Sequence, residues 1–450
     1  MRQRILSILR HLQNAPTRQL DRPEILDACR HVRHSWRHCA LDPVAIIHLF
    51  LTQILRGNVP INHLIRISGL TATASAYCQA RSRLPLALFQ ELVRRVAQRL
   101  RPTIDETGTW HGHRVFIPDG SSFSMPDVPE LREYFGQPTG QRDGCGFPVA
   151  HLLALFHVGT GMLTEAIAGP LYTHDMSGVA RLHPELREGD LLVGDRGFCS
   201  FAHLALLVAR GVHGVFRVHQ RQIVDFTPHR PHAGTSHKRR AKGVPHSRWV
   251  RGLGLTDQVV AWQKPRQRPE WMTAEQYAVL PAELLVRELR YRTGRAGFRV
   301  REVTLVTTLL DAEWYPLVDL AELYRRRWEA EGHLRALKTT MKMEVLRCET
   351  VAGVTKELLM FTLVYNLVRV VMLEASRRQG VPVDRISFVD ALRWLAESRP
   401  GAALPRLVVN PDRADRAEPR VRKRRPKQYP LMRKPRSELR KSLVEYALAS

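Results

Sequence analysis

The sequence has 450 residues, 44% of them hydrophobic, so the chain is long enough to bury more than one core. It carries 69 Lys and Arg against 43 Asp and Glu, which gives a formal net charge of +26 and a sequence pI near 10.7. This excess of positive charge is typical of a protein that binds a polyanion, and it favours nucleic acid as the partner. The six cysteines form no Cys-x-x-Cys pair, which argues against a disulfide framework and fits a reducing cytoplasm.

No stretch of the sequence predicts a membrane segment. Residues 1–14 contain charged residues too early for the apolar core of a signal peptide. The most apolar run, Leu358 to Leu373, includes Asn366 and Arg369 and is shorter than a membrane span requires. We therefore expect a soluble protein without a membrane partner.

Residues 1–105 predict an all-α, basic N-terminal domain that binds DNA. Pro43 to Leu55 and Leu86 to Leu100 place their apolar residues at helical spacing. The same region holds a cluster of soft metal ligands, Cys29, His31, His34, His38 and Cys39. A zinc site is one interpretation of this cluster. The spacing matches no known zinc finger, however, and a basic, His-rich helical surface is the alternative that we favour.

The periodicity changes at about residue 106, and residues 106–220 predict a mixed α/β layer. We expect a short strand over 114–118 that ends in Asp119-Gly120-Ser121. A hairpin is expected over 150–168, followed by a helical stretch over about 175–187. Residues 191–194 predict a buried strand that leads into Asp195-Arg196-Gly197-Phe198, and a helix over 201–209 and a strand over 214–218 complete the layer. Carboxylates at strand ends indicate a site there.

Residues 221–310 predict a β-rich insertion, with strands at 258–262, 284–291 and 298–309. Its basic loop contains Lys238, Arg239 and Arg240, which either contact phosphates or belong to a surface loop, and the sequence leaves both interpretations open. We expect its tryptophans to be core residues rather than platforms for base stacking; these are Trp249, Trp262, Trp271 and Trp314.

Residues 311–350 include a predicted helix over 324–338, which we expect to complete the core. At about 100° per residue, its Tyr324, Arg327, Glu331 and Lys338 lie within about 60° of one another on one face. The carboxylate of Glu331 therefore shares this face with the cations of Arg327 and Lys338 and with the phenol of Tyr324. The alternative is an ordinary exposed face whose charges form pairs four residues apart.

Residues 351–450 predict a helical C-terminal region with a basic tail. Between residues 420 and 441 the tail has eleven Lys and Arg against Glu438 alone. We favour a phosphate-binding arm over a solubilising tail, and we expect Pro426, Pro430 and Pro435 to keep it extended. The arm includes four consecutive cations, Arg422, Lys423, Arg424 and Arg425.

Asp119, Asp195 and Glu331 carry the predicted chemistry. Three carboxylates at one point repel each other unless cations hold them, and hard divalent metals prefer oxygen ligands. Two such ions stabilise the attacking and the leaving oxygen of a phosphodiester displacement. For each acid taken alone, a structural role is the alternative: Asp119 could cap a turn through Gly120, and Asp195 could pair with Arg196.

These motifs together resemble the DDE transposases of bacterial insertion sequences, specifically the insertion sequence four family. The family signature of Tyr, two residues, Arg, three residues, Glu, six residues and Lys is met by Tyr324, Arg327, Glu331 and Lys338. The turns at Asp119 and Asp195 match the first and second acids of the family. The resemblance covers residues of about 40 to 440 and includes the run Tyr77-Cys78-Gln79-Ala80-Arg81.

The resemblance implies a ribonuclease H-like catalytic core that is interrupted by the β-rich insertion. It implies that Asp119, Asp195 and Glu331 are catalytic and bind two Mg2+ ions, with Mn2+ able to replace them. Tyr324, Arg327 and Lys338 would contact DNA phosphates. The implied partners are double-stranded DNA, both transposon ends and target, and a second copy of the chain in the DNA-bound complex. The implied location is the bacterial cytoplasm, at the nucleoid.

Two other classes of protein fit the same residues. One is a catalytically silent DNA-binding protein derived from a transposase, against which the three intact acids argue. The other is a nuclease on the same core, which cuts DNA without joining it to a target.

Overall fold

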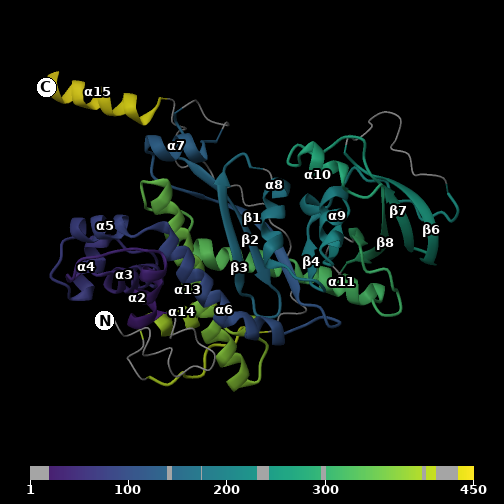
Figure 1. The fold of residues 1–450 in the computed structure, drawn as a ribbon, viewed down its shortest axis with the longest axis horizontal. Coiled ribbons are helices and arrows are strands. Elements are labelled where there is room, and N and C mark those ends of the chain that lie inside the picture. The colour runs from purple at the N-terminus through teal and green to yellow at the C-terminus, as the bar shows by residue number, and fades with distance from the viewer. Residues whose placement is uncertain are drawn as a thin grey trace.

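The computed structural model describes residues 20–138, 144–173, 175–230, 243–294, 301–397, 402–411 and 434–449. One nine-stranded sheet runs through these residues in the order β3-β2-β1-β4-β5-β9-β8-β7-β6. Figure 1 shows the N-terminal helices towards one end of the molecule and strands β6 to β8 at the other. This arrangement confirms the mixed α/β class, while the five domain boundaries stay a prediction.

The first five strands form the half of the sheet that carries the two aspartates. β1, β4 and β5 are parallel to one another, whereas β2 is antiparallel to both β1 and β3. The hairpin expected over 150–168 is confirmed as β2 and β3, and the helix expected over 201–209 is confirmed as α9. The elements of this half are β1(Val115–Ser124), α7(Pro129–Phe135), β2(Val149–His157), β3(Leu163–Pro170), α8(Asp175–Val179), η2(Ala180–Glu185), β4(Leu191–Gly194), η3(Arg196–Phe198), α9(Phe201–Ala209) and β5(His213–Arg217).

The segment predicted as a β-rich insertion extends the same sheet. β9 pairs antiparallel with β5, with Phe216 opposite Val306, and β8, β7 and β6 follow in order. The strands expected there are confirmed, and a fourth strand precedes them. The elements are β6(His246–Gly254), β7(Asp257–Gln263), α10(Ala274–Ala278), β8(Glu283–Thr293) and β9(Arg301–Thr307).

The tryptophans of this region differ in burial. Trp262 is buried, as expected, and donates its indole N–H to Glu288 at 2.9 Å. The expectation is wrong for Trp314, whose side chain is 61% exposed. Asp311 accepts hydrogen bonds from the backbone N–H groups of Glu313 and Trp314, and the resulting turn leaves the indole ring outside the core.

The described N-terminal residues are helical, as predicted. Asp42 begins the second of these helices by accepting a hydrogen bond from the backbone N–H of Ala45 at 2.8 Å. That helix is buried on nearly all sides, which explains its continuous apolar sequence. The helices are α2(Arg22–His31), α3(Pro43–Leu55), α4(Ile61–Ser68), α5(Ala74–Arg83) and α6(Leu86–Glu106).

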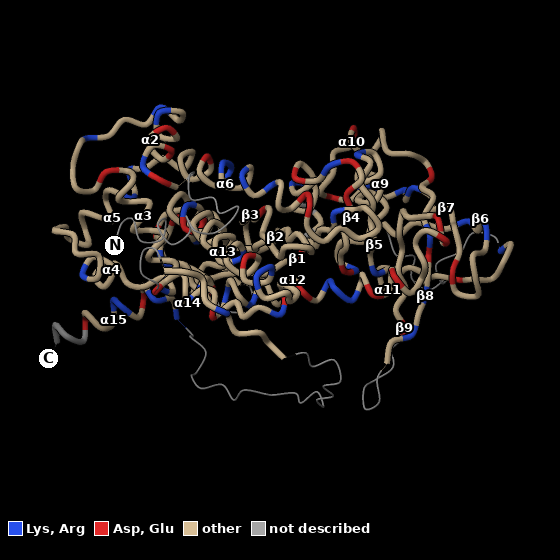
Figure 2. Tube along the Cα trace, turned by 90° about the horizontal axis from the view of Figure 1, so that it is seen from below, with Lys and Arg blue, Asp and Glu red and all other residues tan. Residues whose placement is uncertain are grey.

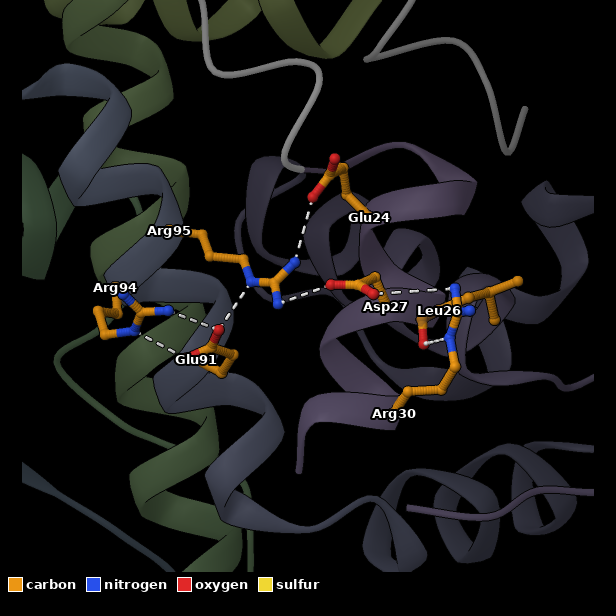
Figure 3. Close-up of polar contacts among 7 residues, drawn as sticks. All are labelled: Glu24, Leu26, Asp27, Arg30, Glu91, Arg94 and Arg95. Atoms are coloured by element: carbon orange, nitrogen blue, oxygen red, sulfur yellow. Dashed lines mark hydrogen bonds and ion pairs between the residues drawn. The ribbon is translucent and has the colours of Figure 1, made fainter. Parts of the chain in front are cut away.

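An ion-pair network joins α2 to α6 (Figure 3). Arg95 of α6 contacts Glu91 at 2.7 Å on its own helix, and it reaches Glu24 at 3.1 Å and Asp27 at 3.0 Å on α2. Arg94 forms a second contact with Glu91 at 2.7 Å. These contacts lower the pKa of Glu91 to about 2, mainly through its hydrogen bond with Arg94. The network therefore stabilises the packing of the two helices in their ionised state.

The long helix α13(Val351–Gln379) is the main contact between the N-terminal helices and the sheet. It packs against α3, α6 and β3. It has 29 residues, so our argument that the apolar run is too short for a membrane span is wrong. In the described part of the chain it is the one helix long and apolar enough to span a membrane, and 89% of its apolar window is buried inside the protein. That burial is typical of a core helix.

The last described elements are η5(Val383–Arg385), α14(Phe388–Glu397) and α15(Arg436–Ala449). The prediction of an extended arm is wrong beyond Pro435, because residues 436–449 form a helix that begins directly after this proline. Arg436 anchors the helix by an ion pair with Asp127 at 3.1 Å, and its guanidinium carbon lies 3.7 Å from the ring centre of Phe147.

Figure 2 shows Lys and Arg on elements throughout the molecule, including α2, α6, β6 and α12(Glu329–Arg335).

Candidate active site

Asp119 lies in β1, and Asp195 directly follows β4, the parallel strand beside it. β1 and β4 pair Val115 with Leu191, so each β1 residue lies beside the residue 76 positions later. Asp195 follows Asp119 by the same 76 positions, so the register, extended past the end of β4, places the two acids at one level of the sheet. Adjacent strands lie about 4.8 Å apart. We expected Asp119 at the end of its strand, and this expectation is wrong. β1 continues to Ser124 by pairing with β2, so Asp119 lies in the middle of the strand.

Each aspartate is oriented by a local hydrogen bond to one of its oxygens. The Oδ1 of Asp119 accepts from the backbone N–H of Gly120 at 2.9 Å, and the Oδ1 of Asp195 accepts from that of Gly197 at 2.7 Å. The pairing of Asp195 with Arg196 that we considered is not formed, because Arg196 donates to Gln220 at 2.9 Å instead. The contact within β1 orients the carboxylate of Asp119 and the turn after β4 orients that of Asp195, and among the described residues Oδ2 of neither accepts a hydrogen bond.

The predicted helix over 324–338 is divided into three helical segments, so the expectation of one continuous helix is wrong. At the break, the backbone N–H of Arg327 bonds the carbonyl oxygen of Tyr324 at 3.2 Å, a spacing of three residues instead of four. The segments are α11(Leu317–Arg326), α12(Glu329–Arg335) and a π-helical turn η4(Ala336–Thr340).

The break lets the two helices pack on two different strands. α11 contacts β5 and α12 contacts β1, and these strands lie on either side of β4 in the sheet. The chain therefore crosses the strand that ends at Asp195. Across the break, Arg327 approaches Glu331 to 3.5 Å and places its guanidinium carbon 4.5 Å from the ring centre of Trp328.

The charges of the three acids act on one another. Burial raises the pKa of Asp119 to about 6, the negative charges of Asp195 and Glu331 push it the same way, and Arg327 opposes them. Burial also raises the pKa of Tyr324, with Asp195 adding to the rise and Arg327 opposing it. Five of the predicted site residues thus share one electrostatic environment: Asp119, Asp195, Tyr324, Arg327 and Glu331. In the sequence, 212 positions separate Asp119 from Glu331.

Arg217, at the end of β5, was missed by sequence reasoning. β4 and β5 are parallel and pair Gly194 with Phe216, so Arg217 lies beside Asp195, one strand further along the sheet. Its charge lowers the pKa of Tyr324, which places the guanidinium close to the site. In the described residues its side chain makes no hydrogen bond or ion pair. A signal for Arg217 was present in the sequence, because a cation stands near the end of the strand expected over 214–218.

Residues 110–367, which include all three acids, match the family model described as the transposase DDE domain. The match covers more than half of the chain. The chain belongs to the DDE transposases. Its relatives place it in the insertion sequence four family that the Tyr-Arg-Glu-Lys motif indicated, and it is a DNA transposase.

Two curated relatives and one solved structure describe what this transposase is similar to. It is 26% identical over 376 residues to the transposase InsG for insertion sequence element IS4 of Escherichia coli K12, covering 79% of this chain and 78% of InsG. It is 35% identical over 123 residues to the putative transposase InsZ of the same organism, covering 25% of this chain and 41% of InsZ. The cryo-EM structure of the piggyBac transposase synaptic complex with hairpin DNA aligns with 86% of this chain and 80% of that chain, at a TM-score of 0.43 and 12% identity.

The site of the transposase has the donor chemistry of a divalent metal site. Three carboxylates offer hard oxygen ligands, and the raised pKa of Asp119 reflects negative charge and burial that a cation would offset. In the described residues, however, no three His, Cys, Asp or Glu side chains lie close enough to hold one ion. The N-terminal cluster of Cys29, His31, His34, His38 and Cys39 likewise forms no metal-holding group, so the zinc interpretation has no support among the described residues. The carboxylates fit the metal in their chemistry, but the described structure does not bring three of them within reach of one ion.

The remaining predicted DNA contacts lie outside this group. Lys338 is half-buried in the π-helical turn, and its ammonium forms no hydrogen bond or ion pair with another described residue. The basic loop residues and the four tail cations fall outside the described residues; they are Lys238, Arg239, Arg240, Arg422, Lys423, Arg424 and Arg425. Their contact with DNA stays a prediction.

Proposed function

We propose that this transposase binds the ends of an insertion sequence and catalyses metal-dependent DNA cleavage followed by strand transfer. Asp119, Asp195 and Glu331 are the catalytic carboxylates and the ligands of two Mg2+ ions, which Mn2+ can replace. The observation that supports this most strongly is the shared register of Asp119 and Asp195, together with the packing of α12, the helix that carries Glu331, on β1. Within this account, strands β1 to β5 form the ribonuclease H-like core.

The phosphate contacts follow from the cations around the acids. Arg327 has a buried Nε–H without a hydrogen-bond partner among the described residues, and a phosphate oxygen would satisfy it. Arg217 offers a second guanidinium beside Asp195, and Tyr324 offers a phenol whose raised pKa keeps it protonated and able to donate. Lys338 supplies a point charge from the next helical turn. Together these groups would orient the scissile phosphodiester against the carboxylates.

The ions, when bound, supply Lewis-acid stabilisation of the attacking and leaving oxygens. The carboxylates would hold the ions, and the partial burial of Asp119 strengthens the electrostatic contacts of that carboxylate. The nucleophile is water for cleavage and the freed 3′-hydroxyl of the DNA for strand transfer. Both steps displace an alcohol from phosphorus, so one site serves both.

The partner is double-stranded DNA, bound through the net charge of +26 and the exposed cations. Pairing two element ends requires two sites, so we propose a homodimer in the DNA-bound complex, acting at the nucleoid of a bacterial cytoplasm. The test is the Asp195→Ala variant with a labelled duplex that carries the element's own ends. Cleavage should be abolished while end binding stays close to that of the wild type. Retained cleavage by the purified variant would refute the assignment of Asp195.

A further inference from the structure

A buried pair of histidines lies behind the turn that carries Asp195. His203 belongs to α9 and His183 to η2, and both side chains are almost fully buried, at 0% and 4% exposure. Their rings are stacked with centres 5.1 Å apart and planes 10° apart. Their Nε2 atoms are 3.1 Å apart, which is the length of a hydrogen bond. The site proposed above does not use either residue.

The hydrogen bonds of the pair have a fixed direction. The Nδ1 of His203 lies 2.7 Å from the carbonyl oxygen of Phe198, and because a carbonyl only accepts, Nδ1 carries the proton. The Nε2 of neutral His203 is then an acceptor, so His183 donates its Nε2–H to it. Burial lowers the pKa of His183 to about 3 and that of His203 to about 4, which keeps both rings neutral.

Phe198 is the last residue of the turn that begins at Asp195. Its backbone N–H donates to the carbonyl oxygen of Asp195 at 3.1 Å, while its own carbonyl oxygen accepts from His203. On the other side it packs against Gly194, where an added Cβ would lie 3.2 Å from the Cβ of Phe198 and 2.8 Å from the ring of Phe216. The turn is thus held from both sides, so its position sets that of the Asp195 carboxylate.

We propose that His203 and His183 are positioning residues that hold Asp195 in the geometry required for binding a divalent metal. The proposal rests on the proposed function, since it takes Asp195 as a metal ligand. Groups that orient a ligand through hydrogen bonds affect metal affinity by about 10- to 100-fold when they are removed. A displacement of the turn by about 1 Å would have an effect of this kind.

The test compares substitutions that keep or remove one hydrogen bond. His183→Gln keeps an Nε2–H that can reach His203, whereas His183→Leu keeps the bulk and loses the donor. His203→Leu removes the bond to Phe198. The matched control is His48→Leu, because His48 is also a buried histidine bonded to a backbone carbonyl, that of Leu20 at 2.8 Å, but it lies in α3. Asp195→Ala serves as the reference for a lost ligand.

The measurements are Mn2+ affinity by calorimetry, the Mg2+ concentration for half-maximal cleavage, end binding and thermal unfolding. We expect His183→Leu and His203→Leu to weaken Mn2+ binding by about 10-fold or more and to raise the Mg2+ requirement, with end binding unchanged. His183→Gln should recover most of the affinity. His48→Leu should lower Tm and leave Mn2+ binding unchanged. If His203→Leu does not fold, the two His183 variants carry the test.

Wild-type Mn2+ affinity in both leucine variants would overturn the proposal. Equal weakening by His48→Leu would also overturn it, because the effect would then be a general loss of stability. If Asp195→Ala itself binds Mn2+ normally, the assignment of Asp195 as a ligand fails, and the positioning role fails with it. A loss of Mn2+ binding in Asp195→Ala with none in the histidine variants refutes the positioning role alone.

Discussion

Arg217 lies beside Asp195, one strand away at the same level of the sheet. The register of β4 and β5 pairs each β4 residue with the residue 22 positions later, as in Gly194 and Phe216, and Arg217 follows Asp195 by 22 positions. With Asp119 on the other side of Asp195, three adjacent strands deliver an acid, an acid and a cation to one place. A phosphate held by the cation would lie directly next to the carboxylates.

Replacing Arg217 with alanine should slow cleavage by about 10- to 100-fold, since a charge-assisted hydrogen bond contributes roughly 1.5 to 3 kcal/mol. End binding should weaken less, and the slope of its salt dependence should fall by about one. The measurements are single-turnover cleavage and binding over a series of salt concentrations. Arg292→Ala is the control, because Arg292 is exposed on β8 and contacts Glu302 at 3.9 Å. Equal effects of both variants would contradict the role of Arg217.

Asp119→Asn should stabilise the metal-free transposase at pH 7.5 while abolishing cleavage. Burial raises the pKa of Asp119 from 3.8 to about 6, so the folded state binds a proton more tightly than the unfolded state does. Its ionised carboxylate therefore lowers the free energy of unfolding above pH 6, by roughly 1 to 3 kcal/mol, and the penalty disappears as the pH falls below 3.8.

The measurement for Asp119→Asn is chemical unfolding in EDTA at a series of pH values. The variant should be more stable than the wild type at pH 7.5, and the difference should shrink as the pH falls from 6 towards 4. In the wild type, the Mg2+ concentration for half-maximal cleavage should rise as the pH falls below about 6, because protons then compete with the metal for Asp119. If Asp119→Asn is less stable than the wild type at pH 7.5, burial does not disfavour the ionised carboxylate, and the prediction is wrong.

Arg95→Ala should destabilise the N-terminal helices by about 1 to 3 kcal/mol, because three carboxylates on α2 and α6 lose their shared partner. The pKa of Glu91 is depressed to about 2, so its share of the stability is present above pH 4.5 and is lost as the pH falls through about 2. The deficit of the variant should therefore be larger at pH 7 than at pH 3.

The measurement for Arg95→Ala is urea unfolding at both pH values. Arg99→Ala is its control, since Arg99 is an exposed residue of the same helix and should change the free energy of unfolding by less than about 0.5 kcal/mol. A deficit of Arg95→Ala that does not depend on pH would mean that lost packing, and not the ion pairs, causes it.

Local sequence patterns predicted the elements that depend on local signals. α3 and α9 are confirmed at the residues expected for them, because continuous apolar runs after a capping residue leave few other structures. The three acids were found through their turns and through the spacing of the helical motif. The structure adds that Asp119 and Asp195 share one strand register, which the sequence did not contain as a pattern.

The features that were missed depend on long-range packing. The break after Arg326 arises because α11 and α12 pack on different strands, and no Pro or Gly marks it. Arg217 and the pair of His183 and His203 become visible only when strand order and helix placement are known. Helical periodicity and residue spacing report on one element at a time, so contacts between elements stay outside their reach.

We propose that Asp119, Asp195 and Glu331 form one metal-dependent site for cutting and joining DNA. The experiment incubates the purified transposase with a labelled duplex bearing its own element ends, in Mg2+ or in Ca2+, beside the Glu331→Ala variant. We predict cleaved and joined products that require both Mg2+ and Glu331. Cleavage without joined products would indicate a nuclease, and tight end binding without any cut strand would contradict the claim.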